Sequence, residues 1–120
     1  RKQFGRAIAE FQLLHAMFAD SKAEIEASRA LVLDAARRRD AGEDVSMAAS
    51  CAKMFASEMV GRVADRNVQV HGGAGYIKDY RAEQLFRDAR LYRIYEGTTQ
   101  IQQGIIARQL VSEARARLAL

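Results

Sequence analysis

The sequence contains neither proline nor tryptophan, and its only cysteine is Cys51. A single cysteine excludes an internal disulfide. Because Cys51 lies among apolar positions with helical spacing, we expect a thiol in the core rather than a nucleophile. This cysteine usage fits a reducing compartment. No run of about 18 apolar residues is present, which predicts that no helix spans a membrane.

The charge is positive overall but is not concentrated in one place. Lysine and arginine total 19 against 15 aspartate and glutamate residues, a formal net charge of +4. Acidic and basic residues alternate through most of the chain, and arginines are dense only at Arg37–Arg39 and in the Arg115/Arg117 tail. Cations are favoured at helix C-termini, and no aromatic side chains interleave with these arginines to stack on bases. We therefore expect no nucleic-acid partner.

The abundant residues are good helix formers, namely alanine, leucine, arginine and glutamate. The length of 120 residues is enough for one domain with a single core, but not for two. From Ile8 to about Arg39, apolar residues recur at steps of three, four or seven. This spacing predicts one long helix that stops at Gly42.

Three further segments show helical spacing. Ser46 is a candidate N-cap for a second long helix, which should end in the glycines after His71. A shorter helix is predicted over 80–94, and Thr98 or Thr99 can cap a last helix. No segment has a strand signal. The expected fold class is therefore all-α, an up-and-down four-helix bundle without a sheet.

Four short motifs stand out from this helical background. Taken singly, each has a plain structural reading: a frayed terminus, a helix stop, a charged helix end and a solvated loop. The two histidines lie far apart in the sequence, so we expect no metal site, and no serine or cysteine has an obvious triad partner. The motifs are RKQFG at 1–5, QVHGGAGY at 69–76, RDAR at 87–90 and IYEGTTQIQ at 94–102.

In this order, and followed by IIAR at 105–108, the motifs resemble the C-terminal helical domain of the acyl-CoA dehydrogenase family from Arg1 to about Ser112. The resemblance implies that residues 1–120 form a single helical-bundle domain of a longer flavoprotein. An N-terminal helical domain and a middle β domain would precede it. The chain opens with Arg1 inside the first motif, which fits a missing N-terminal part. As an isolated fragment the oxidoreductase is expected to be inactive.

The resemblance implies FAD as the cofactor. Arg1, Gln3 and Phe4 match a segment that contacts the FAD of a neighbouring subunit. Gln69, Gly72 and Gly73 match the turn that receives the pyrophosphate and ribose of that FAD. Thr98 and Gln100 match a flavin contact beside the base. An arginine suits a pyrophosphate charge, and glycine lets backbone amides approach it. These eight residues are the predicted cofactor-binding residues.

Glu96 matches the position of the family's catalytic base. The resemblance implies α,β-dehydrogenation of an acyl-CoA thioester in fatty acid metabolism, in which this carboxylate removes the α-proton while the β-hydrogen leaves as hydride to the flavin. The Glu96 N–H and a flavin ribityl hydroxyl would stabilise charge on the thioester oxygen. The implied partners are an acyl-CoA, an electron-transfer flavoprotein as acceptor, and further subunits of a homotetramer, or of a dimer for the fragment.

Some features of the sequence depart from the family's pattern or leave alternatives open. Many relatives have Arg-Leu where this chain has Gln103–Gly104, and Gly104 costs its helix about 1 kcal/mol relative to alanine. Glu96 argues against branches that place the base on another helix. An acyl-CoA oxidase, or a stand-alone helical module for interaction and oligomerisation, stays open. The expected location is the cytoplasm for a bacterial protein and the mitochondrial matrix for a eukaryotic one.

Overall fold

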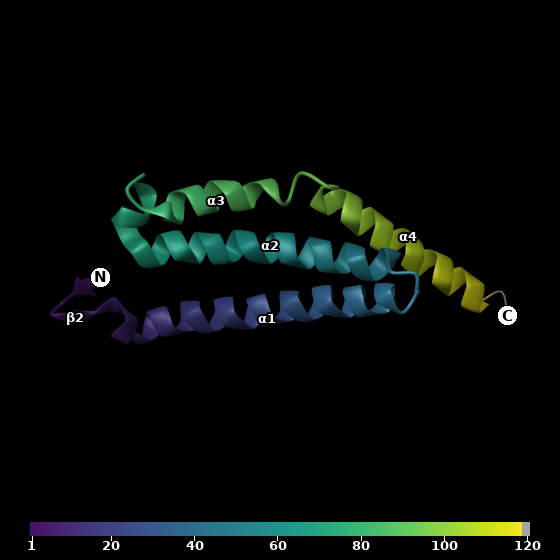
Figure 1. Ribbon diagram of the computed structural model, residues 1–120, viewed down its shortest axis with the longest axis horizontal. Coiled ribbons are helices and arrows are strands. Elements are labelled where there is room, and N and C mark those ends of the chain that lie inside the picture. The colour runs from purple at the N-terminus through teal and green to yellow at the C-terminus, as the bar shows by residue number, and fades with distance from the viewer. Residues whose placement is uncertain (119–120) are drawn as a thin grey trace.

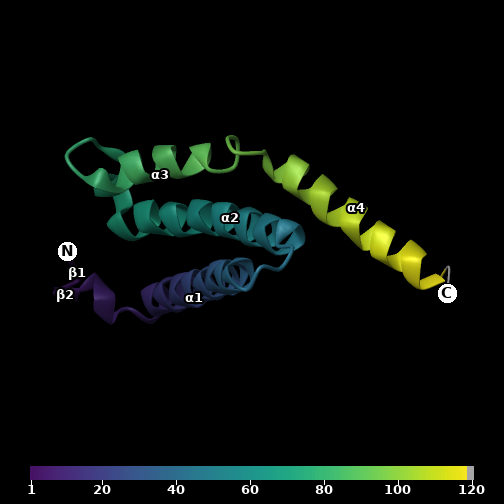
Figure 2. The same ribbon diagram turned by 45° about the vertical axis from the view of Figure 1, so that its right-hand side comes forward.

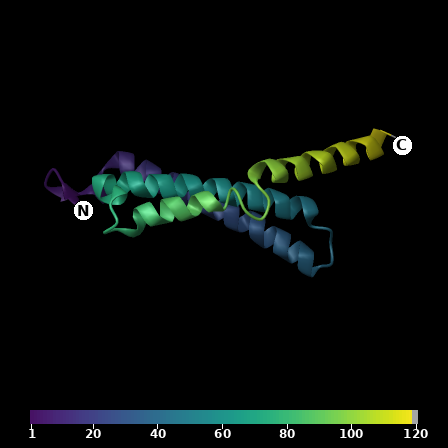
Figure 3. The same cartoon turned by 90° about the horizontal axis from the view of Figure 1, so that it is seen from above.

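Four helices run along one long axis in the computed structural model, which describes residues 1–118. Helices α1 (Gln12–Asp40) and α2 (Ser46–His71) lie side by side and antiparallel, and α3 (Arg81–Leu91) packs on the other side of α2 (Figure 1). Helix α4 (Thr99–Leu118) contacts the first part of α2, and Figures 2 and 3 show it extending away from α1. The predicted set of four helices is confirmed, with α2 at its centre.

The prediction of no sheet is wrong for the first residues. Strands β1 (Lys2–Gln3) and β2 (Arg6–Ala7) form a small antiparallel hairpin. Phe4 and Gly5 between them have φ angles of 53° and 78°. Positive φ at both central positions is the geometry of a two-residue turn whose twist matches that of the strands. A 3-10 turn, η1 (Ile8–Glu10), follows, so the first long helix begins later than the predicted Ile8.

The end of α1 agrees with the sequence prediction, whereas the start of α2 differs from it. Gly42, with φ 81°, follows α1, and the N–H of Glu43 donates to the Arg38 carbonyl at 3.0 Å, which confirms the predicted glycine stop. Ser46 is not the cap of α2 but its first residue. Val45 occupies the cap position, and the Asp44 carboxylate before it accepts hydrogen bonds from the Ser46 hydroxyl at 2.6 Å and from the Ser46 N–H at 3.0 Å.

Two smaller differences concern α3 and the turn before it. The third helix is shorter than the predicted span of 80–94 because it ends at Leu91. Between α2 and α3 lies a second 3-10 segment, η2 (Gly72–Tyr76). The glycines therefore do more than stop α2, since they continue the chain in a tight turn.

The core of the described chain is made of small side chains. The buried apolar residues are all alanines, so the helices approach closely and bury little apolar area. Cys51, expected in the core, is only half-buried. Many large apolar side chains stay exposed on the helix faces, and Leu13 has 82% of its surface accessible. The buried alanines are Ala35, Ala52, Ala64, Ala82 and Ala89.

These exposed apolar faces give the first testable prediction. We expect the isolated chain to self-associate into a dimer or tetramer, because so many exposed large apolar side chains favour burial against another copy of the chain. Sedimentation velocity over a range of concentrations measures this directly. A strictly monomeric species at the highest concentration would contradict the prediction.

A charged bridge joins α1 to α2. The Glu24 carboxylate accepts hydrogen bonds from Arg66 at 3.1 and 3.2 Å and from Arg62 at 3.2 Å. The hydrogen bond from Arg66, followed by that from Arg62 and the charges of both, outweighs the effect of burial and holds the pKa of Glu24 below its ordinary value. The ionised form is thus favoured in the folded chain.

A lowered folded-state pKa stabilises the fold only where the carboxylate is ionised. The contribution of Glu24 is full above the unfolded-state pKa of about 4.3 and is lost as the pH falls through the folded-state value. We therefore expect Glu24→Gln to lower the thermal midpoint of the chain by a few degrees at pH 7, with the difference from wild type disappearing in strong acid. Thermal melts followed by circular dichroism measure it. Glu26→Gln is the matched control, because the Glu26 carboxylate pairs with Lys22 of the same helix at an exposed position.

Among residues 1–118, no helix is both long enough and apolar enough to cross a membrane.

Candidate functional site

The residues expected to form the site gather in two places along α2. At its C-terminal end, Nη1 of Arg1 donates to the carbonyl of His71 at 2.5 Å. Toward its N-terminal end, Nζ of Lys53 donates to the carbonyl of Gly97, next to Glu96, also at 2.5 Å. Lys53 and His71 are eighteen residues apart on one helix, which corresponds to roughly 27 Å. The chain by itself therefore brings Arg1 to the glycine turn and keeps both far from Glu96.

The glycine turn needs glycine for two different reasons. Gly72 has φ 61° and ψ −145°, a conformation that is essentially confined to glycine, and an added Cβ would overlap the guanidinium of Arg1. A Cβ on the buried Gly75 would lie 2.6 Å from the Val68 carbonyl oxygen. Gly73 is exposed, and its Cβ position has no neighbour within 4 Å, so another molecule can approach there.

The hairpin carries its predicted residues on the outside. Phe4 is 92% exposed at the tip, with its ring edge-on to Phe11 at a centroid distance of 6.2 Å. The guanidinium of Arg6 stacks over the same Phe11 ring at 4.1 Å. Gln3 is exposed on β1, and Gln69 is exposed on the last turn of α2. All of these positions are accessible to a ligand or to another subunit.

Glu96 lies in the loop between α3 and α4 with an unusual backbone. Its φ is 53°, and that of Gly97 is 85°, so two consecutive residues are left-handed. Left-handed φ is uncommon for a residue other than glycine. The Thr98 hydroxyl accepts a hydrogen bond from the N–H of Ile101 at 3.3 Å, which confirms Thr98 as a cap of α4. The Glu96 side chain is exposed, as is Gln100 in the first turn of α4.

An apolar hollow of about 510 Å³ opens beside Glu96, between α2 and the end of α3. The rings of Tyr92 and Tyr95 form one wall, with centroids 5.6 Å apart. Burial raises the pKa of the Tyr95 hydroxyl, and the nearby Tyr92 and Glu96 raise it further, so Tyr95 is a neutral group at pH 7. The lining residues are Lys53, Ala56, Ser57, Met59, Val60, Tyr92, Tyr95 and Glu96.

A carboxylate at the rim of an apolar wall can act as a base toward a ligand seated there, since water is excluded on one side. Sequence reasoning had found Glu96 but not this wall. The spacing of Tyr92 and Tyr95, three residues apart where a helix ends, was the available signal. Lys53 carried no local signal at all.

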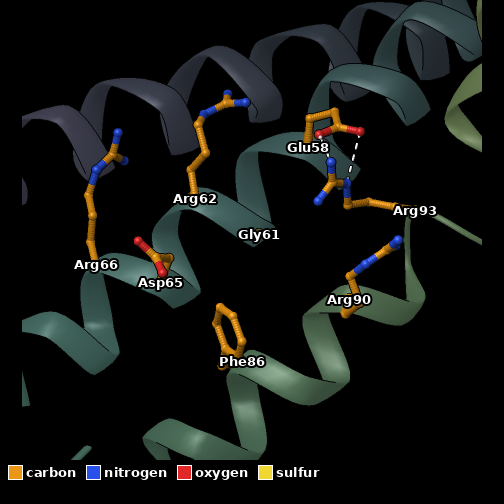
Figure 4. A pocket seen from close by; sticks show the side chains of 8 residues that line it. All are labelled: Glu58, Gly61, Arg62, Asp65, Arg66, Phe86, Arg90 and Arg93. Atoms are coloured by element: carbon orange, nitrogen blue, oxygen red, sulfur yellow. Dashed lines mark hydrogen bonds and ion pairs between the residues drawn. The ribbon is translucent and has the colours of Figure 1, made fainter.

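A second cleft, of about 470 Å³, lies between α2 and α3 and is lined mainly by charged side chains (Figure 4). Nε and Nη2 of Arg93 contact the Glu58 carboxylate at 2.9 and 2.8 Å. Arg62 and Arg66 point from the same cleft toward α1, where Glu24 lies. Most of the positive charge is therefore already used in ion pairs within the fold.

The ion pair of Glu58 is tied to the loop that holds Glu96. The Thr99 hydroxyl also donates to Glu58, at 2.8 Å. Burial alone would raise the pKa of Glu58, but the hydrogen bonds from Thr99 and Arg93, together with the charge of Arg93 and then of Arg62, outweigh it and hold that pKa below its ordinary value. Glu58 thus acts as an ionised anchor at the base of the loop.

Comparison with known proteins gives one family. The family described as "Acyl-CoA dehydrogenase, C-terminal domain" matches residues 1–111. The caffeyl-CoA reductase-Etf complex subunit CarC of Acetobacterium woodii is 44% identical over 113 residues, which cover 94% of this chain and 30% of that protein.

Solved structures are also similar to this chain. The butyryl-CoA dehydrogenase of Megasphaera elsdenii is similar with a TM-score of 0.90 at 38% identity, over 92% of this chain and 29% of that one. An FAD complex of PigA is similar with a TM-score of 0.87 at 31% identity, over the same shares of the two chains. The chain spans about 30% of the length of the relatives it matches.

Proposed function

We propose, from the premise that this chain belongs to the acyl-CoA dehydrogenase family and matches its C-terminal domain, that it carries the catalytic base of an FAD-dependent acyl-CoA dehydrogenase. The observation that carries the proposal is the placement of Glu96. Its carboxylate lies at the rim of an apolar hollow, on a left-handed loop, inside the motif that resembles the family's base. The chain would be the C-terminal part of a longer protein.

The reaction we propose is α,β-dehydrogenation of an acyl-CoA. The Glu96 carboxylate takes the proton from the α-carbon of the thioester, and the β-hydrogen leaves with its electron pair as hydride. FAD, when bound, supplies the acceptor for that hydride. In the reverse direction, protonated Glu96 returns the proton to the α-carbon, which accommodates a relative named as a reductase. The name of that relative also includes an Etf complex, which supports an electron-transfer flavoprotein as partner.

The described residues fit the diphosphate part of FAD. Arg1 brings a guanidinium to the end of α2, where Gly72 holds a glycine-only conformation and the Gly73 backbone is open to approach. A guanidinium beside accessible backbone amides suits a pyrophosphate. Arg1, Gln3, Phe4, Gln69, Gly72 and Gly73 would hold this end of the cofactor, in a neighbouring subunit of a homo-oligomer. The loop that holds Glu96 contacts Lys53, which lies roughly 27 Å along α2 from His71. Glu96 would therefore serve a different copy of the cofactor, near Thr98 and Gln100.

The experiment is an anaerobic titration of the full-length flavoprotein with saturated acyl-CoAs of increasing length. We expect bleaching of the oxidised flavin absorbance by one or more thioesters and none by the corresponding free acids. Rapid return of the absorbance on admitting oxygen, with peroxide formed, would identify an oxidase. A full-length protein that binds no flavin would favour the stand-alone interaction module.

A further inference from the structure

The loop that carries Glu96 is fastened by three side chains from outside it. Lys53 of α2 donates to the Gly97 carbonyl at 2.5 Å, and Gln102 of α4 donates to the Glu96 carbonyl at 3.2 Å. Glu58 of α2 binds the residues on either side of the loop, Arg93 before it and Thr99 after it. Figure 4 shows the Glu58–Arg93 pair at the loop-facing end of the charged cleft. The two carbonyls and both ends of the loop are thus held.

These contacts explain how Glu96 keeps a backbone conformation in the left-handed region. Glu96 and Gly97 both have positive φ, which turns their carbonyls toward donors on two different helices. A residue held in a rare conformation keeps it only where the surroundings over-determine it. Here two hydrogen bonds fix successive peptide planes, so the direction in which the Glu96 side chain leaves the backbone is fixed as well.

Within residues 1–118, the side-chain hydrogen bonds of Lys53 and Gln102 go to this loop. Lys53 is half-buried, and its hydrogen bond within residues 1–118 goes to Gly97. Gln102 is 8% exposed, and its amide nitrogen would lie 2.6 Å from a Cβ placed on Gly97. The loop can therefore accept Gln102 only because position 97 is glycine. A half-buried ammonium and a buried amide are both directed at backbone carbonyls of the same loop.

We infer that Lys53 and Gln102 are positioning residues for Glu96, with Glu58 anchoring the loop ends. The inference rests on the proposed function of Glu96 as the base. Proton transfer needs the carboxylate oxygen within hydrogen-bond reach of the α-proton, and displacements on the order of 1 Å are costly. The two hydrogen bonds act on the rate of proton removal through the orientation of Glu96.

The test uses the full-length flavoprotein. We expect Lys53→Met to lower the limiting rate of flavin reduction about tenfold to hundredfold, while flavin content and the dissociation constant of the acyl-CoA change less than twofold. The isotope effect with an α-deuterated substrate should increase, because proton removal limits the rate more fully. Lys53→Arg, which keeps a donor, should recover most of the rate. Lys22→Met, a lysine with an exposed partner on α1, is the matched control and should behave as wild type.

Gln102 gives an independent variant. Gln102→Met should show the same pattern, and the exposed neighbour Gln103→Met should not. The double variant Lys53→Met/Gln102→Met should lose less than the product of the two single losses, because both act on one loop.

Two outcomes would overturn the inference. Wild-type reduction rates in both single variants, with Glu96→Gln inactive, would remove the positioning role and leave the proposed base intact. Losses of flavin content or acyl-CoA affinity that parallel the loss of rate in both variants would show a merely structural role. A near-normal rate in Glu96→Gln would instead remove the proposed function itself.

Discussion

Glu96→Gln in the full-length flavoprotein is expected to lower the rate of flavin reduction by acyl-CoA about 10²–10⁴-fold, the range that a positioned general base supplies. Glutamine keeps the size of the side chain and the backbone N–H of residue 96. It lacks the basic oxygen that accepts the α-proton. Anaerobic stopped-flow absorbance of the flavin measures the rate.

The carboxylate can also be moved rather than removed. Glu96→Asp should fall between wild type and glutamine, because the oxygen is withdrawn by about one methylene and small misplacements are costly. Flavin content should be the same in all three proteins, because neither substitution alters Arg1 or the glycine turn, the residues proposed to hold the pyrophosphate of FAD. Reduction of Glu96→Gln at a near-normal rate would place the base elsewhere.

The second large effect is expected at the glycine turn. Gly72→Ala should weaken FAD binding about tenfold to hundredfold, for two reasons that act together. Alanine cannot readily adopt φ 61° with ψ −145°, and its Cβ would displace the Arg1 guanidinium from His71. Loss of one charge-assisted hydrogen bond to a pyrophosphate corresponds to about 1.5–3 kcal/mol. Equilibrium dialysis or flavin fluorescence against the apoprotein gives the affinity.

Gly42→Ala is the control for backbone strain alone. Gly42 has φ 81° at the end of α1, and its Cβ would meet nothing within 4 Å. The substitution should lower stability by about 1 kcal/mol without changing FAD affinity. Equal FAD affinity in Gly72→Ala and wild type would mean that this turn does not receive the cofactor.

The sequence predicted those parts of the fold that local patterns encode. Helical spacing and the glycines Gly42 and Gly72 predict the ends of the long helices. Thr98 and Thr99 are both predicted as possible caps of the last helix, and the hydroxyl of Thr98 makes the capping hydrogen bond. The hairpin was missed because two-residue strands are too short to show alternation, although Phe4-Gly5 is a turn pair. Ser46 is a good cap residue, but the cap position of α2 is Val45, and the type of residue at one position does not by itself determine where a helix begins.

The candidate site was predicted only in part for a similar reason. Glu96 lies in a recognisable motif, but Lys53 and Glu58, which hold its loop, do not. Lys53 and Gly97 are 44 residues apart in the chain, and Glu58 and Arg93 are 35 apart. Contacts between helices at such separations leave no periodic trace in a single sequence. They follow from how α3 and the loop after it pack on α2, which only the three-dimensional structure provides.

The most direct test of the account is to follow the α-hydrogen itself. The full-length flavoprotein and its Glu96→Gln variant, both anaerobic and in deuterium oxide, are incubated with a saturated acyl-CoA that bleaches the wild-type flavin. The thioester is then recovered and analysed by mass spectrometry and NMR. With Glu96 as the base, wild type should incorporate solvent deuterium at the α-carbon and the variant should incorporate none above the rate in buffer. Incorporation at the wild-type rate in Glu96→Gln would contradict the assignment of this residue as the base.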